Sequence, residues 1–188
     1  MPSASFLRWQ NDRMPRLNEV DVHCTAVLAM VPPNPTFLDE TLRGFVLHLS
    51  AHFQGFCRDL HSECIQVFSN AAPVHLQRVI QIQCRAARDL DSANPKMESI
   101  RKDFARFELD LSVAFGRNSL NALRITHLGH LNLWRNYVAH HKGIPPGHGG
   151  PLSLTTVRSW KNSCDGLAAE LDGIMYNQLQ TILGTPPW

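Results

Sequence analysis

Charge is scarce in this sequence of 188 residues. Charged residues make up 18% of the chain, and 18 Lys and Arg against 16 Asp and Glu leave a net charge of +2. Globular proteins usually have about a quarter of their residues charged, so this composition excludes a disordered polyelectrolyte. The small positive excess neither requires nor excludes a nucleic-acid partner. With 44% hydrophobic residues, the chain can bury one core, and we expect a single domain over residues 1–188.

Paired cysteines and long hydrophobic runs are also missing. The five cysteines are an odd number, and no Cys-x-x-Cys spacing occurs. A disulfide framework is therefore excluded, and reduced thiols in a cytoplasmic protein are expected. No stretch approaches ~18 consecutive apolar residues, and the N-terminus lacks an apolar run. We expect neither a membrane span nor a signal peptide.

Several motifs that would point to other folds and chemistries do not occur. No alternating strand pattern of useful length and no hairpin dipeptide is found, which argues against a β-sheet. The phosphate-loop, dinucleotide, zinc-protease and hydrolase-elbow patterns are missing as well. We therefore expect no cofactor and no resident metal.

Amphipathic helices are what the sequence does contain. The longest is predicted over residues 36–70, with Thr36 as its N-cap. At about 100° per residue its apolar positions fall in one arc, whereas Arg43, Gln54, Arg58 and His61 fall on the far side. The apolar positions are Leu38, Leu42, Phe45, Val46, Leu49, Phe53, Phe56, Leu60, Cys64 and Val67.

The remaining segments complete an all-α bundle with long antiparallel helices. We expect residues 1–33 to be an N-terminal extension with a short helix, and residues 36–184 to be the core bundle. Ser153 is predicted to cap the last helix and Gly184 to end it. The other helices are predicted over residues 16–30, 74–88, 95–115, with Asn94 as cap, and 119–142, and residues 143–151 form a Gly/Pro-rich loop.

The helix predicted over residues 119–142 carries an unusual polar stripe. Asn132, Asn136 and His140 lie four residues apart and therefore share one side of the helix. Small polar side chains in this position favour a surface that is half-buried against a partner chain or a ligand. Arg135 lies at the edge of the stripe, and its long side chain can reach into it. The opposite face is predicted to be core and consists of Leu120, Leu123, Leu128, Leu131, Trp134 and Val138.

The end of this helix resembles a known motif. Residues 135–140 read Arg-Asn-Tyr-Val-Ala-His, which is similar to the R-x4-H motif of the HEPN superfamily, with a polar residue directly after the Arg. The long helix, with SAHFQGFCRDLH at residues 50–61, is similar to the first helix of the RiboL-PSP group of HEPN proteins. The resemblance covers about residues 20–188.

The resemblance implies a function. Such proteins are homodimers in which two motifs meet at a cleft, and they cleave RNA without metal through attack by the 2′-hydroxyl. His140 would then act as general acid or base. Arg135 would hold the scissile phosphate, and Asn136 would orient the His or donate to a phosphate oxygen. The resemblance further implies a role in toxin–antitoxin or phage-defence systems, with an antitoxin or defence partner.

Further residues are candidates for contacts with RNA. Some superfamily members carry a modifiable Tyr two residues after the His, but Lys142 occupies that position, so Lys142 and His141 are expected to contact phosphates instead. Asn132 belongs to the same stripe.

A second polar stripe, on the long helix, allows two interpretations. His48, His52 and Asp59 either line the cleft beside the motif or form a helix edge that faces water. A zinc site on this helix is disfavoured, because His48 and His52 lie on a different side from Cys57 and His61.

Two alternatives to the nuclease stay open. One is a non-catalytic HEPN dimer that binds RNA, nucleotides or a protein. The other is an interaction scaffold without a nucleic-acid role, in which the stripe of Asn132, Asn136 and His140 makes protein contacts only.

Overall fold

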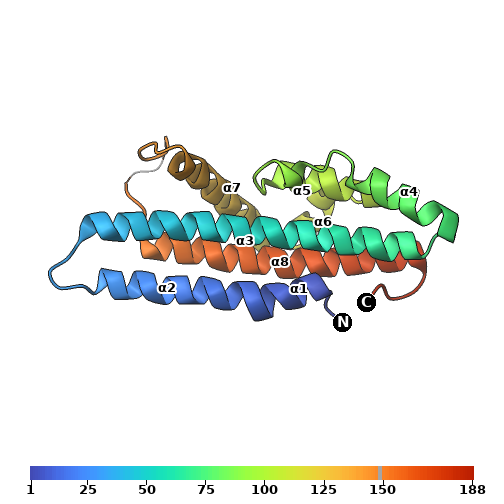
Figure 1. Cartoon of the computed structure of the whole chain (residues 1–188), viewed down its shortest axis with the longest axis horizontal. Coiled ribbons are helices and arrows are strands. Elements are labelled where there is room, and N and C mark those ends of the chain that lie inside the picture. Colours follow the sequence, from blue (N-terminus) through green and yellow to red (C-terminus); the bar gives the residue numbers. More distant parts are fainter. Residues whose placement is uncertain (148–149) are drawn as a thin grey trace.

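The computed structural model describes residues 1–147 and 150–188 and is an all-α bundle, as predicted (Figure 1). The residues so described contain no β-strand. None of their helices is long and apolar enough to cross a membrane. The helices are α1 (Ala4–Arg8), α2 (Met14–Leu28), α3 (Pro35–Asn70), α4 (Val74–Arg85), α5 (Met97–Phe104), α6 (Leu111–Gly116), α7 (Leu120–Ala139) and α8 (Leu154–Leu183), with a π-helical turn at Trp9–Arg13 and 3-10 turns at Asp89–Asp91 and Ala105–Phe107.

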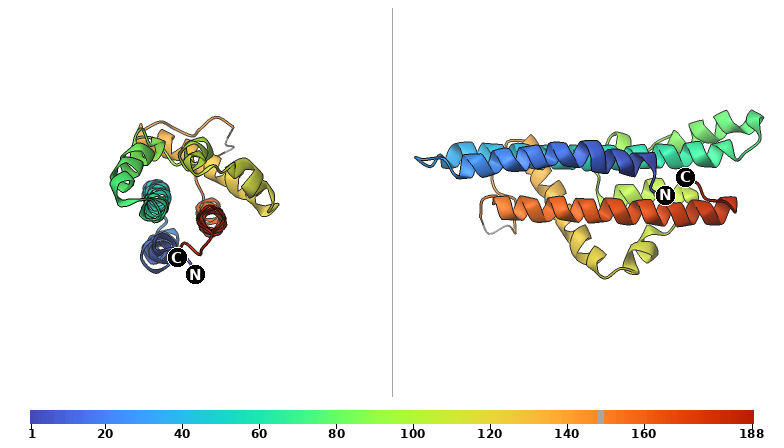
Figure 2. Two further views of the ribbon diagram at one scale, coloured as in Figure 1. Left: turned by 90° about the vertical axis from the view of Figure 1, so that its right-hand side faces the viewer. Right: turned by 90° about the horizontal axis from the view of Figure 1, so that it is seen from below.

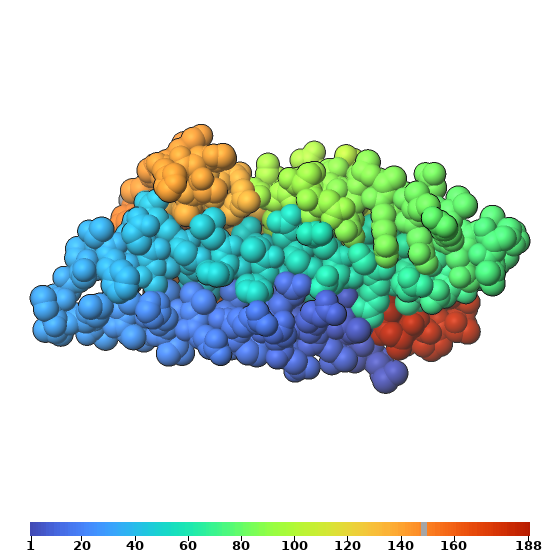
Figure 3. Space-filling model, in the orientation of Figure 1, coloured from blue at the N-terminus to red at the C-terminus, as the bar shows by residue number. Residues whose placement is uncertain are grey.

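Helices α3 and α8 form the spine of the molecule (Figures 1 and 2). On one side α1 and α2 run along them, and on the other side α4, α5 and α7 pack against α3 (Figure 2). The predicted apolar arc of α3 is buried from Leu42 to Cys64, while Leu38 and Val67 are half-buried. In the space-filling view, one edge of α3 still reaches the surface between these two layers (Figure 3).

The first turn of α3 is capped two residues earlier than predicted. Thr36 is inside the helix, and the side chain of Asn34 accepts a hydrogen bond from the Phe37 amide at 3.0 Å. Pro35 then occupies the first helical position, where its missing N–H has no consequence. The sequence Asn-Pro therefore starts α3, and the prediction of Thr36 as its cap was wrong.

His61 was expected on the solvent side of α3, and the structure shows it fully buried. Its Nε2 lies 3.1 Å from the carbonyl oxygen of Asp103, and its ring packs edge-on against Phe104 and Phe107. The reason is that α5 and the following 3-10 turn cover this second side of α3. A periodicity argument that assumes a single buried face cannot detect such a residue.

The single helix predicted over residues 95–115 is broken into three pieces. The chain leaves the helical conformation at Glu108, which adopts a left-handed conformation with φ of 54°. Asp110 then caps α6 by accepting hydrogen bonds from the amides of Ser112 and Val113. Asn94 and Pro95 precede α5, which begins at Met97 without a side-chain cap. A local cap at Asp110 thus competes successfully with continuation of the helix.

The N-terminal residues are part of the core rather than an appendage. Trp9 and Leu17 are fully buried. Glu63 of α3 accepts hydrogen bonds from the amides of Ala4 and Ser5 at 2.8 Å, which satisfies the free N–H groups at the start of α1. Asp21 of α2 pairs with Lys161 of α8 at 2.7 Å in a nearly buried ion pair. Both predicted end signals of α8 are confirmed, with Ser153 as N-cap and Gly184 left-handed at the C-terminus.

Burial of His61 predicts a loss of stability in mild acid. Burial, and next the positive charge of Arg88, lower the pKa of His61 from 6.5 to about 4. As the pH falls from 6.5 to about 4, the unfolded chain therefore binds a proton at His61 that the folded protein does not bind. We expect the free energy of unfolding to fall by up to roughly 3 kcal/mol over this window and to level off below it. Urea unfolding at a series of pH values measures this loss.

His61→Gln isolates the contribution of this side chain, because the amide can still donate to the Asp103 carbonyl but does not titrate. The variant should lose less stability than wild type between pH 7 and pH 4. His75→Gln on α4, where His75 is exposed, serves as the matched control and should follow wild type. Equal pH dependence in His61→Gln and wild type would show that His61 is not the group responsible.

Candidate functional site

The candidate site is at the C-terminal end of α7, which stops earlier than predicted. The helix ends at Ala139, and the chain reverses at His141, whose φ is 51°. The amide of Lys142 donates to the carbonyl of Tyr137 at 2.9 Å, and that of His141 to Val138 at 3.1 Å. This pair of bonds is a Schellman motif with His in the left-handed position that Gly usually occupies. The predicted stop at Gly143 was therefore wrong by two residues.

Three polar side chains surround this turn. His140, His141 and Lys142 are all exposed. The ammonium group of Lys142 lies over the ring of Tyr137, 5.5 Å from its centroid, which holds the end of the turn against the last turn of α7. The turn thus presents two imidazoles and an ammonium group to solvent next to one helix end.

Asn136 is held in a fixed orientation one turn before His140. Its Oδ1 accepts hydrogen bonds from Nδ2 of Asn94 and from Nη1 of Arg135, the latter at 3.4 Å. Because both bonds use the oxygen, the Nδ2 hydrogens of Asn136 are the ones that can donate to a ligand. Arg135 is half-buried and lies beside this amide. Arg135, Asn136 and His140 are therefore at one helix end, as the sequence predicted.

Asn132 does not belong to an open polar stripe. Only 3% of its surface is exposed. Its Nδ2 donates to the carbonyls of Pro95 at 3.1 Å and Leu128 at 2.9 Å. The stripe is thus half-buried, as predicted, but at Asn132 and Asn136 the covering surface is the segment 94–95 of the same chain. A direct contact between Asn132 and RNA is excluded by this burial.

The core face of α7 was predicted correctly only in its second half. Leu128, Leu131, Trp134 and Val138 are buried, whereas Leu120 is 61% and Leu123 58% exposed. The corner between α6 and α7 projects away from α3 and α8 (Figure 2), so the first turns of α7 have fewer neighbours.

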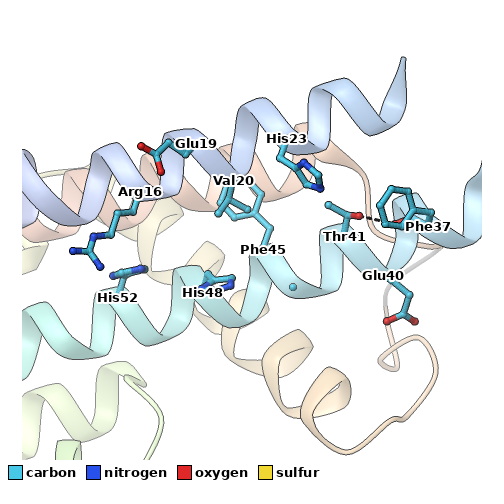
Figure 4. A pocket seen from close by; sticks show the side chains of 11 residues that line it. Arg16, Glu19, Val20, His23, Phe37, Glu40, Thr41, Phe45, His48 and His52 are labelled. Atoms are coloured by element: carbon cyan, nitrogen blue, oxygen red, sulfur yellow. Dashed lines mark hydrogen bonds between the residues drawn. The ribbon is translucent and has the colours of Figure 1, made fainter. Parts of the chain in front are cut away.

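The structure separates the second polar stripe from the motif. His48 and His52 line a groove whose walls belong to α2 and α3 (Figure 4). Asp59 instead forms ion pairs with Arg8 at 3.0 Å and with Arg13 at 2.7 Å, and so anchors the N-terminal segment. No residue of α7 lines this groove, which does not fit a cleft beside the motif. His48 is exposed, as expected for a helix edge that faces water, whereas Asp59 is held in ion pairs.

Metal chemistry finds no support in residues 1–147 and 150–188, where no three His, Cys, Asp or Glu side chains are placed to hold an ion. Burial raises the pKa of the Cys57 and Cys64 thiols well above the usual range, so these are poor ligands and poor nucleophiles. The groups at the end of α7 can instead exchange protons, donate hydrogen bonds and bind an anion. No family model matches this chain, and neither a curated protein nor a solved structure is significantly similar to it.

Sequence reasoning missed Asn94 as part of this site. It was interpreted as a helix cap, whereas its amide orients Asn136, which lies 42 positions further along the chain. No local pattern signals such a contact, because it depends on how the segment before α5 packs against α7.

The left-handed His141 predicts an unusual gain in stability on substitution. Left-handed backbone costs a residue other than Gly about 1 kcal/mol, and Gly removes this cost. We therefore expect His141→Gly to raise the free energy of unfolding by about 1 kcal/mol in urea titrations. His140→Gly, at a position with φ of −107°, is the control and should not stabilise. A destabilised His141→Gly would mean that the imidazole makes contacts that outweigh the strain.

Proposed function

We propose that the chain is a metal-independent endoribonuclease whose active groups are Arg135, Asn136 and His140. The observation that carries the proposal is the arrangement at the end of α7: His140 is exposed and follows, one helical turn later, an amide at Asn136 whose orientation is fixed and which accepts a hydrogen bond from the Arg135 guanidinium. The resemblance of residues 135–140 to the R-x4-H motif supplies the reaction class. A role in toxin or defence systems, with a restraining partner protein, is part of the same proposal.

The chemistry assigned to each residue follows from its surroundings. His140 is exposed and can exchange protons with a ribose 2′-hydroxyl or a leaving 5′-oxygen. Arg135 can bind the phosphate and offset the charge that develops in the transition state. Asn136 donates to a phosphate oxygen through its free amide hydrogens. Lys142 and His141 add positive charge on the path of the RNA backbone.

A second copy of the chain would complete the site. The outward side of α7 next to the motif carries small, apolar and neutral polar side chains and no Asp, Glu, Lys or Arg, which is unusual for a helix that faces water. Gly129 lies on this side, and a Cβ there would meet nothing within 4 Å, so another helix can approach closely. The side chains on this face are Ala122, Leu123, Thr126, His130, Leu133 and Tyr137.

The first test is RNA cleavage by the purified protein and its His140→Ala variant. Wild type should cut labelled RNA in the presence of EDTA and leave a 2′,3′-cyclic phosphate, because the 2′-hydroxyl is the nucleophile. His140→Ala should lose at least ~100-fold in rate, the usual range for removal of a general acid or base. Gel analysis of labelled fragments measures both.

The control is His75→Ala on α4, an exposed histidine remote from α7 in sequence, which should cleave as wild type does. Full activity in correctly folded His140→Ala, or activity abolished by EDTA, contradicts the assignment. Tight RNA binding by wild type without turnover would favour the alternative, a non-catalytic RNA-binding dimer.

The second test concerns the dimer. Thr126→Glu places a charge on the outward face of α7, and Thr181→Glu places the same charge on an exposed threonine of α8; each hydroxyl bonds the carbonyl four residues earlier. Sedimentation should show a dimer for wild type and Thr181→Glu and a monomer for Thr126→Glu, which should also lose cleavage. A monomeric but fully active Thr126→Glu would show that one chain suffices.

A further inference from the structure

A groove of about 670 Å³ lies between α2 and α3, towards the end of the bundle where residues 29–34 connect the two helices (Figure 4). It belongs to helices that carry none of the residues at the end of α7. Its apolar side chains and its basic side chains lie in different parts of the groove. The side chains that define it are Arg16, Val20, Phe37, Phe45, His48 and His52.

The middle of the groove is apolar and open. Val20 and Phe45 lie together where α2 and α3 face each other (Figure 4), and Phe45 is fully buried, so Val20 and Phe37 supply the accessible apolar surface of the groove. Gly44 leaves the floor free, since a Cβ at this position would meet nothing within 4 Å. Phe37 is 43% exposed and forms an edge contact with the ring of His23, at 6.4 Å between centroids. An apolar body of modest size therefore fits without movement of either helix.

One end of the groove is lined by basic side chains. The rings of His48 and His52 are stacked one turn apart on α3, with centroids 6.4 Å apart. Arg16 of α2 directs its guanidinium towards His52 (Figure 4), while it also pairs with Asp12 at 2.8 Å. Burial, and then the charges of Arg13, His48 and Arg16, lower the pKa of His52, whereas Asp12 acts in the opposite direction. An anion at this end would offset that positive potential.

Two carboxylates also border the groove, but at other places. In Figure 4, Glu19 points away from α3 and Glu40 points away from the histidine end. The charge therefore favours an anionic head group beside His48 and His52 and not in the rest of the groove.

We propose that this groove binds a small organic anion with an apolar body, such as an aryl or short alkyl carboxylate. The body lies over Gly44 against Val20 and Phe37, and the carboxylate lies against Arg16, His48 and His52. An inorganic anion would make no contact with the apolar part of the groove, and a neutral molecule would make no charge interaction with the basic end.

Isothermal titration at pH 6 tests the ligand class with three probes. These are 4-phenylbutyrate, the neutral 4-phenylbutanol and inorganic phosphate. The carboxylate should bind about tenfold more tightly than the alcohol, since one charge contact in a half-buried site contributes on the order of 1 kcal/mol. It should also bind more tightly than phosphate. Equal affinity of the carboxylate and the alcohol, or no binding of the carboxylate, overturns the proposal.

Two leucine substitutions test the location. Gly44→Leu fills the floor of the groove and should weaken 4-phenylbutyrate binding at least tenfold. Gly173→Leu is the matched control: Gly173 is an exposed helical glycine with free space around it, in another groove of about 640 Å³ between α6 and α8. It should bind as wild type does. Unchanged binding in Gly44→Leu, or equal loss in both variants, places the ligand elsewhere and overturns the proposal.

The pH dependence tests the role of the histidines. An anion favours protonated imidazole, so wild-type affinity should rise as the pH falls from 7.5 to 6, and His52→Gln should flatten this rise. A wild-type affinity that does not change with pH contradicts the assignment of His52. RNA cleavage by Gly44→Leu should equal that of wild type, so the two proposals fail or succeed separately.

Discussion

The burial of α3 on more than one side is the constraint from which the rest of the structure follows. A helix of 36 residues can carry a bundle only if its neighbours cover most of its length, and α1, α2, α4, α5, α7 and α8 all pack against it. Its main apolar arc is buried, and Cys57 and His61, which do not belong to that arc, are buried as well. Each of these contacts removes apolar surface from water, which is the dominant favourable term in folding. The candidate site and the groove lie on surfaces that these contacts leave exposed, the end of α7 and the space between α2 and α3.

This constraint explains which features could be predicted from sequence. Helices α3 and α8 follow from periodicity, and the caps of α8 follow from local hydrogen bonding. The sequence therefore predicted the bounds of both helices almost to the residue. Periodicity assigns one buried face to a helix and fails where there are two, as at His61. It also fails where a helix extends beyond its partners, as at Leu120 and Leu123, because an apolar residue is exposed there for lack of neighbours.

The breaks in the chain were the least predictable features. Glu108 and His141 both adopt the left-handed conformation without being Gly, and no local rule demands this of Glu or His. In each case other hydrogen bonds replace those of a continued helix. At the start of α6 these are the bonds to the Asp110 cap, and at the end of α7 they are the Schellman bonds to Tyr137 and Val138. The candidate residues Arg135, Asn136 and His140 could be selected from sequence, but Asn94, the partner that orients Asn136, could not.

The architecture around α7 gives a physical reason to propose catalysis at this helix end. A site that stabilises developing charge works best when its groups are already oriented before the substrate arrives. Asn136 meets this condition because its oxygen accepts two hydrogen bonds from its own chain, and the backbone bonds of the turn that follows fix the main chain at His140. Arg135 keeps a long side chain that can adjust to the phosphate. In the proposed reaction the fixed amide of Asn136 would set the geometry, and the guanidinium of Arg135 would follow the charge. A second copy against the uncharged side of α7 would exclude water from both groups.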